Sequence, residues 1–442
     1  MIYLLCICVF GLFVLSAIVF KRDFTAPAVL ITLGFVISLL CCCIYADEWN
    51  FSDYRLFWVI ISGLSGFILA CWLAFVFVKK RKTKSCEITN VKISTVDEVD
   101  ISNIKLTIYL GIQLVFVLFQ IYDLYRNSRG GSLSYAIGYY YSMNSSGTLE
   151  YKSQVLNIAG ILIMPANYII LYVLARKITH RRKVAVLLIL NVGVSIVSSL
   201  LSGTRTTLFM YAISFSVMFI IQKQRVTKKK MNINLKNIIK FFIVFYLAIV
   251  VFSSLFSLQG RTISDLTMVD LIANYLGAPI KNLELFIKDN ITNNGKPAGS
   301  ATFMNTYTWL NELTGKQIFD IPNLYKYRWN NGKILGNVYT QFMPLYYDYG
   351  IGGVFFVMFI LGFFCQKIYN KVKMQADNNR IDYHLILYSY IAFAIVFCFF
   401  SNKFFELIFA RAMIYNIVGI LFFDILFFRL QVKERGFVIR IG

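Results

Sequence analysis

The chain has 442 residues, of which 58% are hydrophobic, 17% aromatic and only 15% charged. Soluble domains carry about a quarter charged residues, so this composition excludes an ordinary soluble protein. The formal net charge of +22 is typical of nucleic acid binding, but most basic residues stand in short segments beside apolar runs, where they orient membrane helices. We therefore expect no nucleic acid partner.

Long apolar runs recur along the whole chain and predict its fold class. Each run is long enough to cross roughly 30 Å of hydrocarbon. We expect an all-α polytopic membrane protein with about 11 transmembrane helices. The predicted spans are residues 2–20, 27–45, 56–78, 104–122, 155–175, 184–201, 206–221, 238–257, 345–369, 383–400 and 412–428.

The first three runs set the orientation. No basic segment precedes the first run, and Lys21 and Arg22 follow it. A cleavable signal peptide has the opposite charge order, so we expect a retained helix whose N-terminus lies outside. The acidic and aromatic segment 46–54 is then an outer loop, and the polar segment 79–103 is an inner one.

The middle of the chain alternates between outer and inner connections. Segment 123–153 is expected outside, with an interfacial helix over 134–141, and the basic segment 176–183 is expected inside. Four residues, 202–205, separate the sixth run from the seventh. This short connection indicates a tight outer hairpin.

The longest polar interval between two spans, residues 259–341, is predicted on the outer, periplasmic side. Residues 269–287 have the pattern of an amphipathic helix that packs on the membrane domain and is interrupted near Gly277 and Pro279. We therefore expect helices 1–8 over residues 1–258, the long periplasmic loop over 259–341, and helices 9–11 with a cytoplasmic tail over 342–442. A short outer turn is expected over 401–411.

The distribution of basic residues supports this map. Of the 44 Lys and Arg residues, 29 fall on the predicted inner side and 15 on the outer side. Eight of these 15 lie in the long loop, and long loops report orientation weakly. The short loops therefore favour an outer N-terminus and an inner C-terminus.

The cysteines and histidines indicate neither a disulfide nor a metal site. None of the nine cysteines falls in the long loop. Cys41, Cys42 and Cys43 are consecutive, and consecutive helical positions point about 100° apart, so they do not converge on one metal ion. His180 and His384 are both predicted on the inner side. We expect no metal and no cofactor.

Arg205 is the most informative polar residue of the apolar regions. It stands at the outer start of the seventh span, where a cation opposes the positive end of the helix dipole. An arriving anion explains a cation at this position, because the first-turn N–H groups, the guanidinium, and the hydroxyls of Thr204, Thr206 and Thr207 together suit a phosphate. The alternative is an interfacial arginine that reaches water or pairs with an outer carboxylate.

Two further charged residues stand at outer helix ends. Arg261 follows the eighth span, where the C-terminal end of a helix favours a cation without any ligand. Asp348 follows Pro344 near the start of the ninth span. It is either a first-turn carboxylate that stabilises the helix start or a carboxylate that faces an outer cavity as a base or as an arginine partner. Lys403, Glu406 and Arg411 add charge at the same depth.

Aromatic residues are frequent in the second half of the long loop. They have two interpretations, because aromatic rings stack on sugar rings and also anchor loops at the level of lipid headgroups. The residues concerned are Tyr307, Trp309, Phe319, Tyr325, Tyr327 and Trp329.

Several motifs occur in one order on the predicted outer face. They are Ser202-Gly-Thr-Arg-Thr206 at a helix start, Tyr275-Leu-Gly-Ala-Pro-Ile280 in the long loop, and Gly336-Asn-Val-Tyr-Thr340 followed by Asp348-Tyr-Gly350 and Gly353. Together with the topology, these segments resemble the pattern of bacterial Wzy-type oligosaccharide repeat-unit polymerases, which make O-antigen or capsule.

The resemblance implies a GT-C-like glycosyltransferase of the bacterial inner membrane. Such an enzyme transfers a growing glycan from undecaprenyl diphosphate to an incoming lipid-linked repeat unit on the periplasmic side, without a nucleotide sugar or a metal. Its partners would be membrane lipid and a chain-length regulator. The implied catalytic residues are Arg205, Arg261 and Asp348, and the implied substrate-binding residues are Thr204, Thr206, Tyr275, Asn337, Tyr339, Tyr347 and Arg411.

Two alternative functions remain open. The first is an O-antigen ligase, which passes finished glycan to another acceptor; that family carries a histidine in its long outer loop, and this loop has none. The second is a flippase or other transporter of lipid-linked oligosaccharides. A transporter is expected to carry charges deep in several helices, whereas the predicted helix centres here are nearly uncharged.

Overall fold

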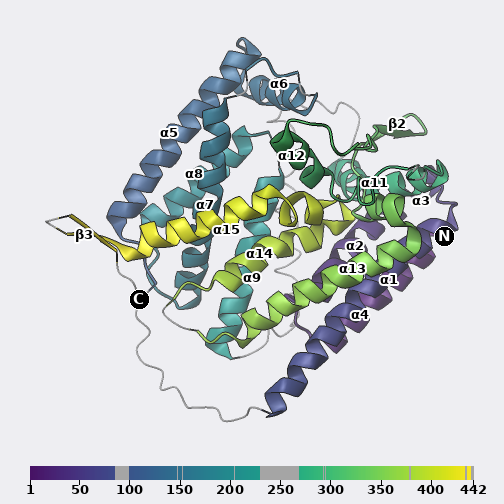
Figure 1. Ribbon diagram of the computed structural model, residues 1–442, viewed down its shortest axis with the longest axis horizontal. Coiled ribbons are helices and arrows are strands. Elements are labelled where there is room, and N and C mark those ends of the chain that lie inside the picture. The colour runs from purple at the N-terminus through teal and green to yellow at the C-terminus, as the bar shows by residue number, and fades with distance from the viewer. Residues whose placement is uncertain are drawn as a thin grey trace. The chain divides into compact units, whose positions relative to one another are not determined.

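The computed structural model describes residues 1–84, 99–146, 148–151, 153–203, 205–228, 268–291, 293, 295–377, 380–433 and 436–439. They are mostly helical (Figure 1). The chain divides into two compact units. Unit 1 comprises Met1–Lys92, Thr267–Gln375 and Tyr390–Met413, and unit 2 comprises Ile93–Leu266, Ala376–Ser389 and Ile414–Gly442.

Eight of the described helices are long and apolar enough to cross a membrane, which confirms a helical multi-pass membrane protein. They are α1 (Ile2–Val19), α2 (Pro27–Ile44), α4 (Tyr54–Lys84), α5 (Asn103–Ser128), α7 (Gln154–Thr179), α9 (Thr206–Thr227), α13 (Phe342–Met374) and α15 (Arg411–Asp424), whose apolar stretch continues as a π-helix over Ile425–Arg429.

Two shorter apolar helices, α8 (Val186–Leu201) and α14 (Tyr383–Val396), lie where the sixth and tenth spans are predicted. A 3-10 turn, Phe397–Phe399, extends α14. The predicted eighth span, 238–257, lies outside the described residues. The count of about 11 spans therefore stays a prediction.

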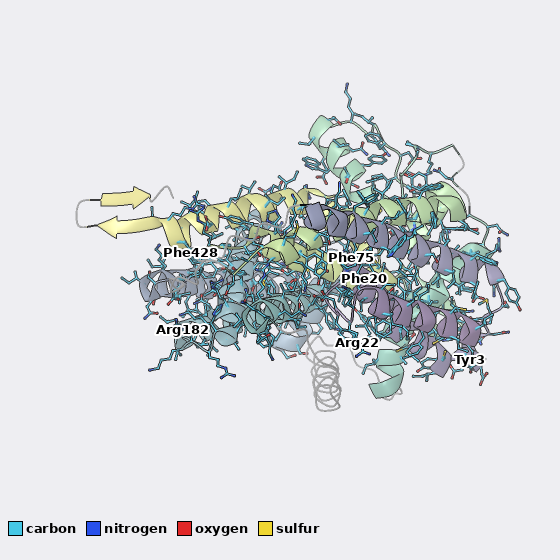
Figure 2. The ribbon with its side chains drawn as sticks, turned by 90° about the horizontal axis from the view of Figure 1, so that it is seen from below. Tyr3, Phe20, Arg22, Phe75, Arg182 and Phe428 are labelled. Atoms are coloured by element: carbon cyan, nitrogen blue, oxygen red, sulfur yellow. The ribbon has the colours of Figure 1, made fainter. Side chains whose placement is uncertain are left out.

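Unit 1 is built on close helix pairs. α4 and α13 run side by side (Figure 1) and approach closely at two glycines. A Cβ atom on Gly66 would lie 2.5 Å from the Phe355 carbonyl oxygen, and one on Gly362 would lie 2.4 Å from that of Phe67. Small residues of this kind let helix backbones meet in membranes. The segment after α1 also packs on α4, through the rings of Phe20 and Phe75, whose centroids are 5.4 Å apart (Figure 2).

The ninth predicted span begins earlier than expected and contains a break. Helix α13 starts at Phe342, and Gly350 within it has φ 66° and ψ −169°. The chain therefore forms a short helical segment before Gly350 and the long spanning helix after it. Glycine adopts this backbone conformation without the steric cost that a side chain would add.

The long loop contains a helix that the sequence predicts, α11 (Met268–Lys288), and it packs on α2 as expected. The predicted interruption at Gly277 and Pro279 is wrong, because α11 continues through both. Ser38 donates to the Leu276 carbonyl at 2.6 Å and Cys42 donates to the Gly277 carbonyl at 3.4 Å. These donors from α2 bind carbonyls of the turn that precedes Pro279, and so hold α11 to α2 at the proline.

Three other elements of unit 1 were not predicted. Helix α12 covers Met304–Thr314, and strands β1 (Arg328–Asn330) and β2 (Lys333–Gly336) form an antiparallel hairpin. Its turn is Asn331-Gly332, and both residues have positive φ. The segment predicted as a loop over 46–54 contains the short helix α3 (Ala46–Trp49), and the predicted outer turn after α14 contains a π-helix, Phe404–Ile408.

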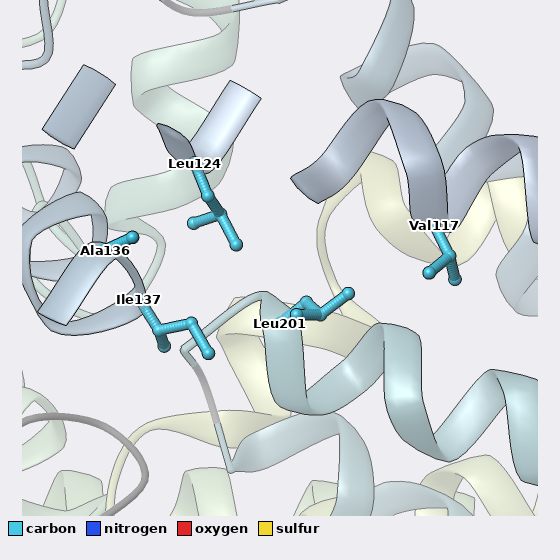
Figure 3. Packing of buried hydrophobic residues seen from close by; sticks show 5 residues of the cluster. All are labelled: Val117, Leu124, Ala136, Ile137 and Leu201. Atoms are coloured by element: carbon cyan, nitrogen blue, oxygen red, sulfur yellow. The ribbon is translucent and has the colours of Figure 1, made fainter. Parts of the chain in front are cut away.

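Unit 2 packs α5 against α8 and α7 against α9. The predicted helix over 134–141 is confirmed and is longer, because α6 covers Leu133–Ser146. It packs against α5 and α8 through an apolar cluster (Figure 3), which comprises Val117, Leu124, Ala136, Ile137 and Leu201. A second hairpin, β3 (Leu430–Lys433) with β4 (Gly436–Ile439), follows the last helix.

Candidate functional site

Arg205 lies at the start of a spanning helix in unit 2, as the sequence predicts. α8 ends at Leu201, Gly203 turns the chain with φ 67°, and Arg205 is the N-cap residue of α9. The arginine is buried, with 6% of its surface exposed. Thr206 is half-buried in the first turn of α9, and Thr204 lies outside the described residues.

A cavity of about 420 Å³ lies between α7, α8 and α9, and Arg205 lines it. Most of the lining is aliphatic or aromatic, for example Leu171, Val192 and Phe209. Among the described lining residues, Arg205 is the one that carries a charge, and Asn167, Ser195 and Tyr211 are neutral and polar. The cavity therefore combines an apolar wall with one guanidinium.

A network of neutral side chains holds the polar part of this wall. Asn167 Oδ1 accepts from the Tyr109 hydroxyl and from Gln113 Nε2, each at 2.9 Å, and Asn167 Nδ2 donates to the Tyr211 hydroxyl at 2.9 Å. Gln113 Nε2 also donates to Ser195 Oγ at 2.9 Å. The network joins α5, α7, α8 and α9 without a formal charge. The network was not predicted, although all five of its members are polar or phenolic residues within predicted apolar runs.

In unit 1, two of the quoted motif segments lie against each other. Asn282 of α11 donates to the Val338 carbonyl at 2.8 Å and to the Gly336 carbonyl at 3.4 Å. Asn274 donates to the Ile334 carbonyl at 3.1 Å. These contacts bring together Tyr275–Ile280, which Asn274 and Asn282 flank in α11, and Gly336–Thr340, which begins at the last residue of β2. Within them Asn337 is exposed.

Tyr339 is fully buried and holds the β1–β2 hairpin to the rest of unit 1. Its hydroxyl accepts from Arg328 Nε at 2.9 Å and donates to the Lys326 carbonyl at 2.8 Å, and Arg328 also pairs with Asp289 at 2.5 Å. Burial raises the pKa of Tyr339, while the Arg328 guanidinium acts in the opposite direction. Its ring contacts Phe286 and Tyr325, so it packs inside the protein.

Asp348 does not stabilise the first turn of a helix, because α13 begins six residues earlier and has no acidic residue there. Its carboxylate instead binds the loop before α12. Oδ2 accepts from the Thr302 backbone N–H at 2.7 Å and from the Thr302 hydroxyl at 2.6 Å, and Oδ1 accepts from the Ala301 N–H at 3.3 Å. The loop is therefore held at the N-terminal part of α13.

The remaining predicted binding residues are spread over unit 1. The Tyr275 ring contacts Phe400, with centroids 4.7 Å apart, and Tyr347 is buried against Phe286. Arg411 is half exposed and pairs with Glu312 of α12 at 3.0 Å. Among the loop aromatics, Tyr307 and Phe319 stack on each other, whereas Tyr327 and Trp329 are exposed.

A buried ion pair of unit 1 was not predicted. Lys281 and Glu284 of α11 lie 2.5 Å apart, and their side chains are 2% and 0% exposed. Glu284 also accepts from the backbone N–H groups of Ser52 and Asp53, at 2.6 and 2.9 Å. Burial lowers the pKa of Lys281, and Glu284 acts in the opposite direction. The pair fastens α11 to the segment before α4.

The predicted catalytic residues do not all fall within one described region. Arg205 belongs to unit 2 and Asp348 to unit 1. Arg261 lies outside the described residues. The common cavity that the sequence predicts for these three residues stays a prediction. Within the described ranges, no group of three or more His, Cys, Asp or Glu residues is placed to hold a metal ion.

Comparison with protein-family models, with curated proteins and with solved structures finds no match to this chain. The functional interpretation therefore depends on the motifs, the membrane topology and the geometry of the two units.

Proposed function

We propose that the chain is a glycosyltransferase that polymerises lipid-linked oligosaccharide repeat units on the outer side of a bacterial inner membrane. The donor is a glycan on undecaprenyl diphosphate, and the acceptor is a second lipid-linked repeat. The observation that carries the proposal is the position of Arg205, the charged residue among the described lining residues, in a mostly apolar cavity of about 420 Å³.

The cavity matches the chemistry of this donor. A polyprenyl diphosphate joins a long apolar chain to an anionic head, so it fits a site that has apolar walls and one guanidinium. Arginine binds phosphate oxygens through two parallel N–H groups, and the first-turn N–H groups of α9 favour an anion as well. A charged residue among spanning helices is costly and usually marks a substrate site.

The reaction needs stabilisation of a leaving group. The acceptor hydroxyl oxygen forms a bond to the anomeric carbon of the donor sugar, and the bond from that carbon to the diphosphate oxygen breaks with its electron pair. Undecaprenyl diphosphate leaves with an additional negative charge. A guanidinium in a partly dehydrated cavity stabilises this charge in the transition state more than in the ground state.

The outer part of unit 1 supports the proposal independently. Its motif segments resemble those of Wzy-type polymerases, and side-chain amides hold two of them together. A GT-C-like fold and a chain-length regulator as partner belong to the same proposal.

Purified protein in nanodiscs, supplied with an undecaprenyl diphosphate-linked repeat unit, tests the proposal. We expect the wild type to lengthen the glycan and Arg205→Ala to lower the rate by about 10²–10³-fold, the effect of removing one charge-stabilising donor. Arg205→Lys should retain part of the rate, because it keeps the charge and loses the two-pronged geometry. Arg129, which is exposed and pairs with Glu150, provides the control variant Arg129→Ala.

Each contrary outcome has a separate meaning. Unchanged glycan length with the wild type contradicts a polymerase and favours a transporter. Transfer to an acceptor that is not lipid-linked favours a ligase. Full activity of Arg205→Ala removes Arg205 from the mechanism.

A further inference from the structure

The cavity of unit 2 extends along helix α9, and Arg205 lies at one end of it. Five of its lining residues on α9 recur at spacings of three and four, so they form one stripe of the helix: Arg205, Leu208, Phe209, Ala212 and Phe215. From the first to the last of them the helix rises by about 15 Å. Because Arg205 is the N-cap residue of α9, the charge lies at the end of the cavity nearest the α8–α9 turn.

The cavity is closed on one side and open on another. On α7 the lining residues Asn167, Ile170 and Leu171 are buried, so this helix forms the closed wall. On α8 the lining residue Ile196 is 43% exposed, and on α9 the lining residue Ala212 is exposed as well. The cavity therefore opens sideways between two apolar helices. In a bilayer such an opening meets lipid chains rather than water.

The volume of the cavity limits how much of a lipid chain it holds. An apolar cavity of about 150 Å³ holds one benzene molecule, so a cavity of about 420 Å³ has room for roughly three groups of that size. An isoprene unit has nearly as many carbons as benzene, so roughly three isoprene units fit. An undecaprenyl chain is several times longer, so most of it lies outside the cavity.

The two parts of such a chain contribute differently to binding. Units inside the cavity make packing contacts with its lining, and these contacts are lost where the cavity stays empty. Units outside the cavity lie in the hydrocarbon of the bilayer both before and after the diphosphate binds. Since their surroundings do not change, they add little to the affinity.

We propose that the cavity binds only the roughly three isoprene units next to the diphosphate of the donor. The remaining chain leaves the protein between α8 and α9, past Ile196 and Ala212, and lies in the bilayer. The inference rests on the proposed function and deepens it, because it names the part of the lipid that the protein recognises. Arg205 holds the diphosphate, and the stripe of α9 contacts the units that follow it. Beyond these units, the length of the chain does not affect recognition.

Competition binding to the purified full chain in detergent micelles tests the length limit. Geranyl, farnesyl and undecaprenyl diphosphate each displace radiolabelled undecaprenyl diphosphate, and each affinity is expressed per amount of competitor in the micelle, so that the free chain is always in hydrocarbon. We expect farnesyl and undecaprenyl diphosphate to bind within about threefold of each other. Geranyl diphosphate leaves part of the cavity unfilled and should bind at least about tenfold more weakly. Steady tightening from farnesyl to undecaprenyl diphosphate overturns the length limit.

Ile196→Trp tests the sideways exit, because a large ring in the opening obstructs a chain that passes through it more than a chain that ends inside the cavity. We expect the loss of affinity to be about tenfold larger for undecaprenyl diphosphate than for farnesyl diphosphate. Val197→Trp is the matched control, since Val197 is the next residue, is 46% exposed and is not among the described lining residues. Binding of farnesyl diphosphate by Ile196→Trp shows that the variant is folded.

The contrary outcomes separate the inference from the proposed function. Equal losses for the two diphosphates in Ile196→Trp, or the same losses in Val197→Trp, overturn the exit between α8 and α9. Phosphatidic acid that competes as strongly as farnesyl diphosphate overturns the recognition of isoprene units, because any anionic lipid then suffices. A wild type that lengthens glycan but binds farnesyl diphosphate no more tightly than geranyl diphosphate overturns the inference and leaves the polymerase standing. A wild type that binds as expected but does not lengthen glycan overturns the polymerase and leaves a site for isoprenoid diphosphates.

Discussion

The region around α11 in unit 1 and the cavity of unit 2 bury polar groups in different ways. In unit 1 the buried groups include full charges, and each has a partner, as in Lys281 with Glu284. Around the cavity of unit 2 the buried polar groups are amides and hydroxyls that satisfy one another, as Asn167 does with Tyr109, Gln113 and Tyr211, and Arg205 is the charged exception.

This difference follows from the cost of burial. A charge taken from water costs several kcal/mol unless it is paired, whereas a neutral amide costs less and is satisfied by one or two hydrogen bonds. Ion pairs are therefore tolerated around α11 in unit 1, where they fasten this helix to the segment before α4. Neutral groups suit the interior of a spanning bundle. We expect the two regions to respond differently to substitution.

The largest effect is expected for Lys281→Met. This change leaves Glu284 buried without its closest cation, and a broken buried ion pair typically costs about 3–5 kcal/mol of unfolding free energy. Denaturant unfolding of the protein in detergent measures it. Lys288→Met is the matched control, because Lys288 lies 3.5 Å from the same carboxylate and is 36% exposed. Equal losses of unfolding free energy in the two variants would show that burial of Lys281 does not increase the cost of breaking its ion pair.

A smaller loss is expected for Asn167→Leu in unit 2. The change removes three hydrogen bonds, but bonds between membrane helices average about 0.6 kcal/mol each, so we expect a loss of about 1–2 kcal/mol. The same unfolding measurement applies, with Asn157→Leu as the control, since Asn157 is an exposed residue of the same helix. A loss as large as that of Lys281→Met would remove the distinction between the two regions.

Filling the cavity should affect binding rather than folding. Ala212 lines it, so Ala212→Phe is expected to raise KM for the lipid-linked donor roughly tenfold, at the lower end of what one group changes in an apolar pocket. Ser216→Phe places the same side chain one turn further along α9, at an exposed position that does not line the cavity. Kinetics of both variants check this, and identical KM values would speak against a lipid in the cavity.

The smallest effect on stability is expected when low pH protonates Asp53, the residue before α4. Hydrogen bonds from Arg55 lower the pKa of Asp53 below its ordinary value of 3.8, and Arg55 also donates to Asn290 after α11. The stability from this group is fully present above pH 3.8 and is lost as the pH falls through the lower, folded-state pKa. Because Arg55 is 42% exposed, we expect less than about 1 kcal/mol.

Melting temperatures at neutral and at acidic pH measure this contribution. In Asp53→Asn the acid-dependent part should disappear. A difference of the same size in wild type and variant would assign the acid sensitivity to other carboxylates.

Two features that were not predicted, the β1–β2 hairpin and the polar network of unit 2, nevertheless have a local pattern in the sequence. The Asn331-Gly332 pair is a strong hairpin signal, because both residues tolerate the positive φ of a two-residue turn. The polar residues Gln113 and Asn167 within apolar runs likewise indicate contacts between helices. Both patterns are local, so the sequence alone is sufficient to predict a hairpin and contacts between helices at these positions.

Other features had no local signal. Pro279 normally ends or kinks a helix, yet Ser38 and Cys42, more than 200 positions earlier in the chain, support the turn around it. The partners of Asp348 are Ala301 and Thr302, more than 40 positions away. Such contacts depend on how helices pack, and neither periodicity nor composition reports it.

The sequence by itself determined the class of the protein. Apolar run length decides which segments can enter a bilayer, because it acts through the free energy of transfer of each segment separately. The flanking basic residues bias the orientation of those segments. The sequence also placed Arg205 at the start of its helix, because an apolar run begins directly after it. The tertiary structure alone decided what surrounds Arg205 and which donors each carboxylate meets. Asp348 accepts from the backbone and hydroxyl of Thr302, and Glu406 accepts from the ammonium of Lys403, and the contacts of Asp348 depend on how the loop packs.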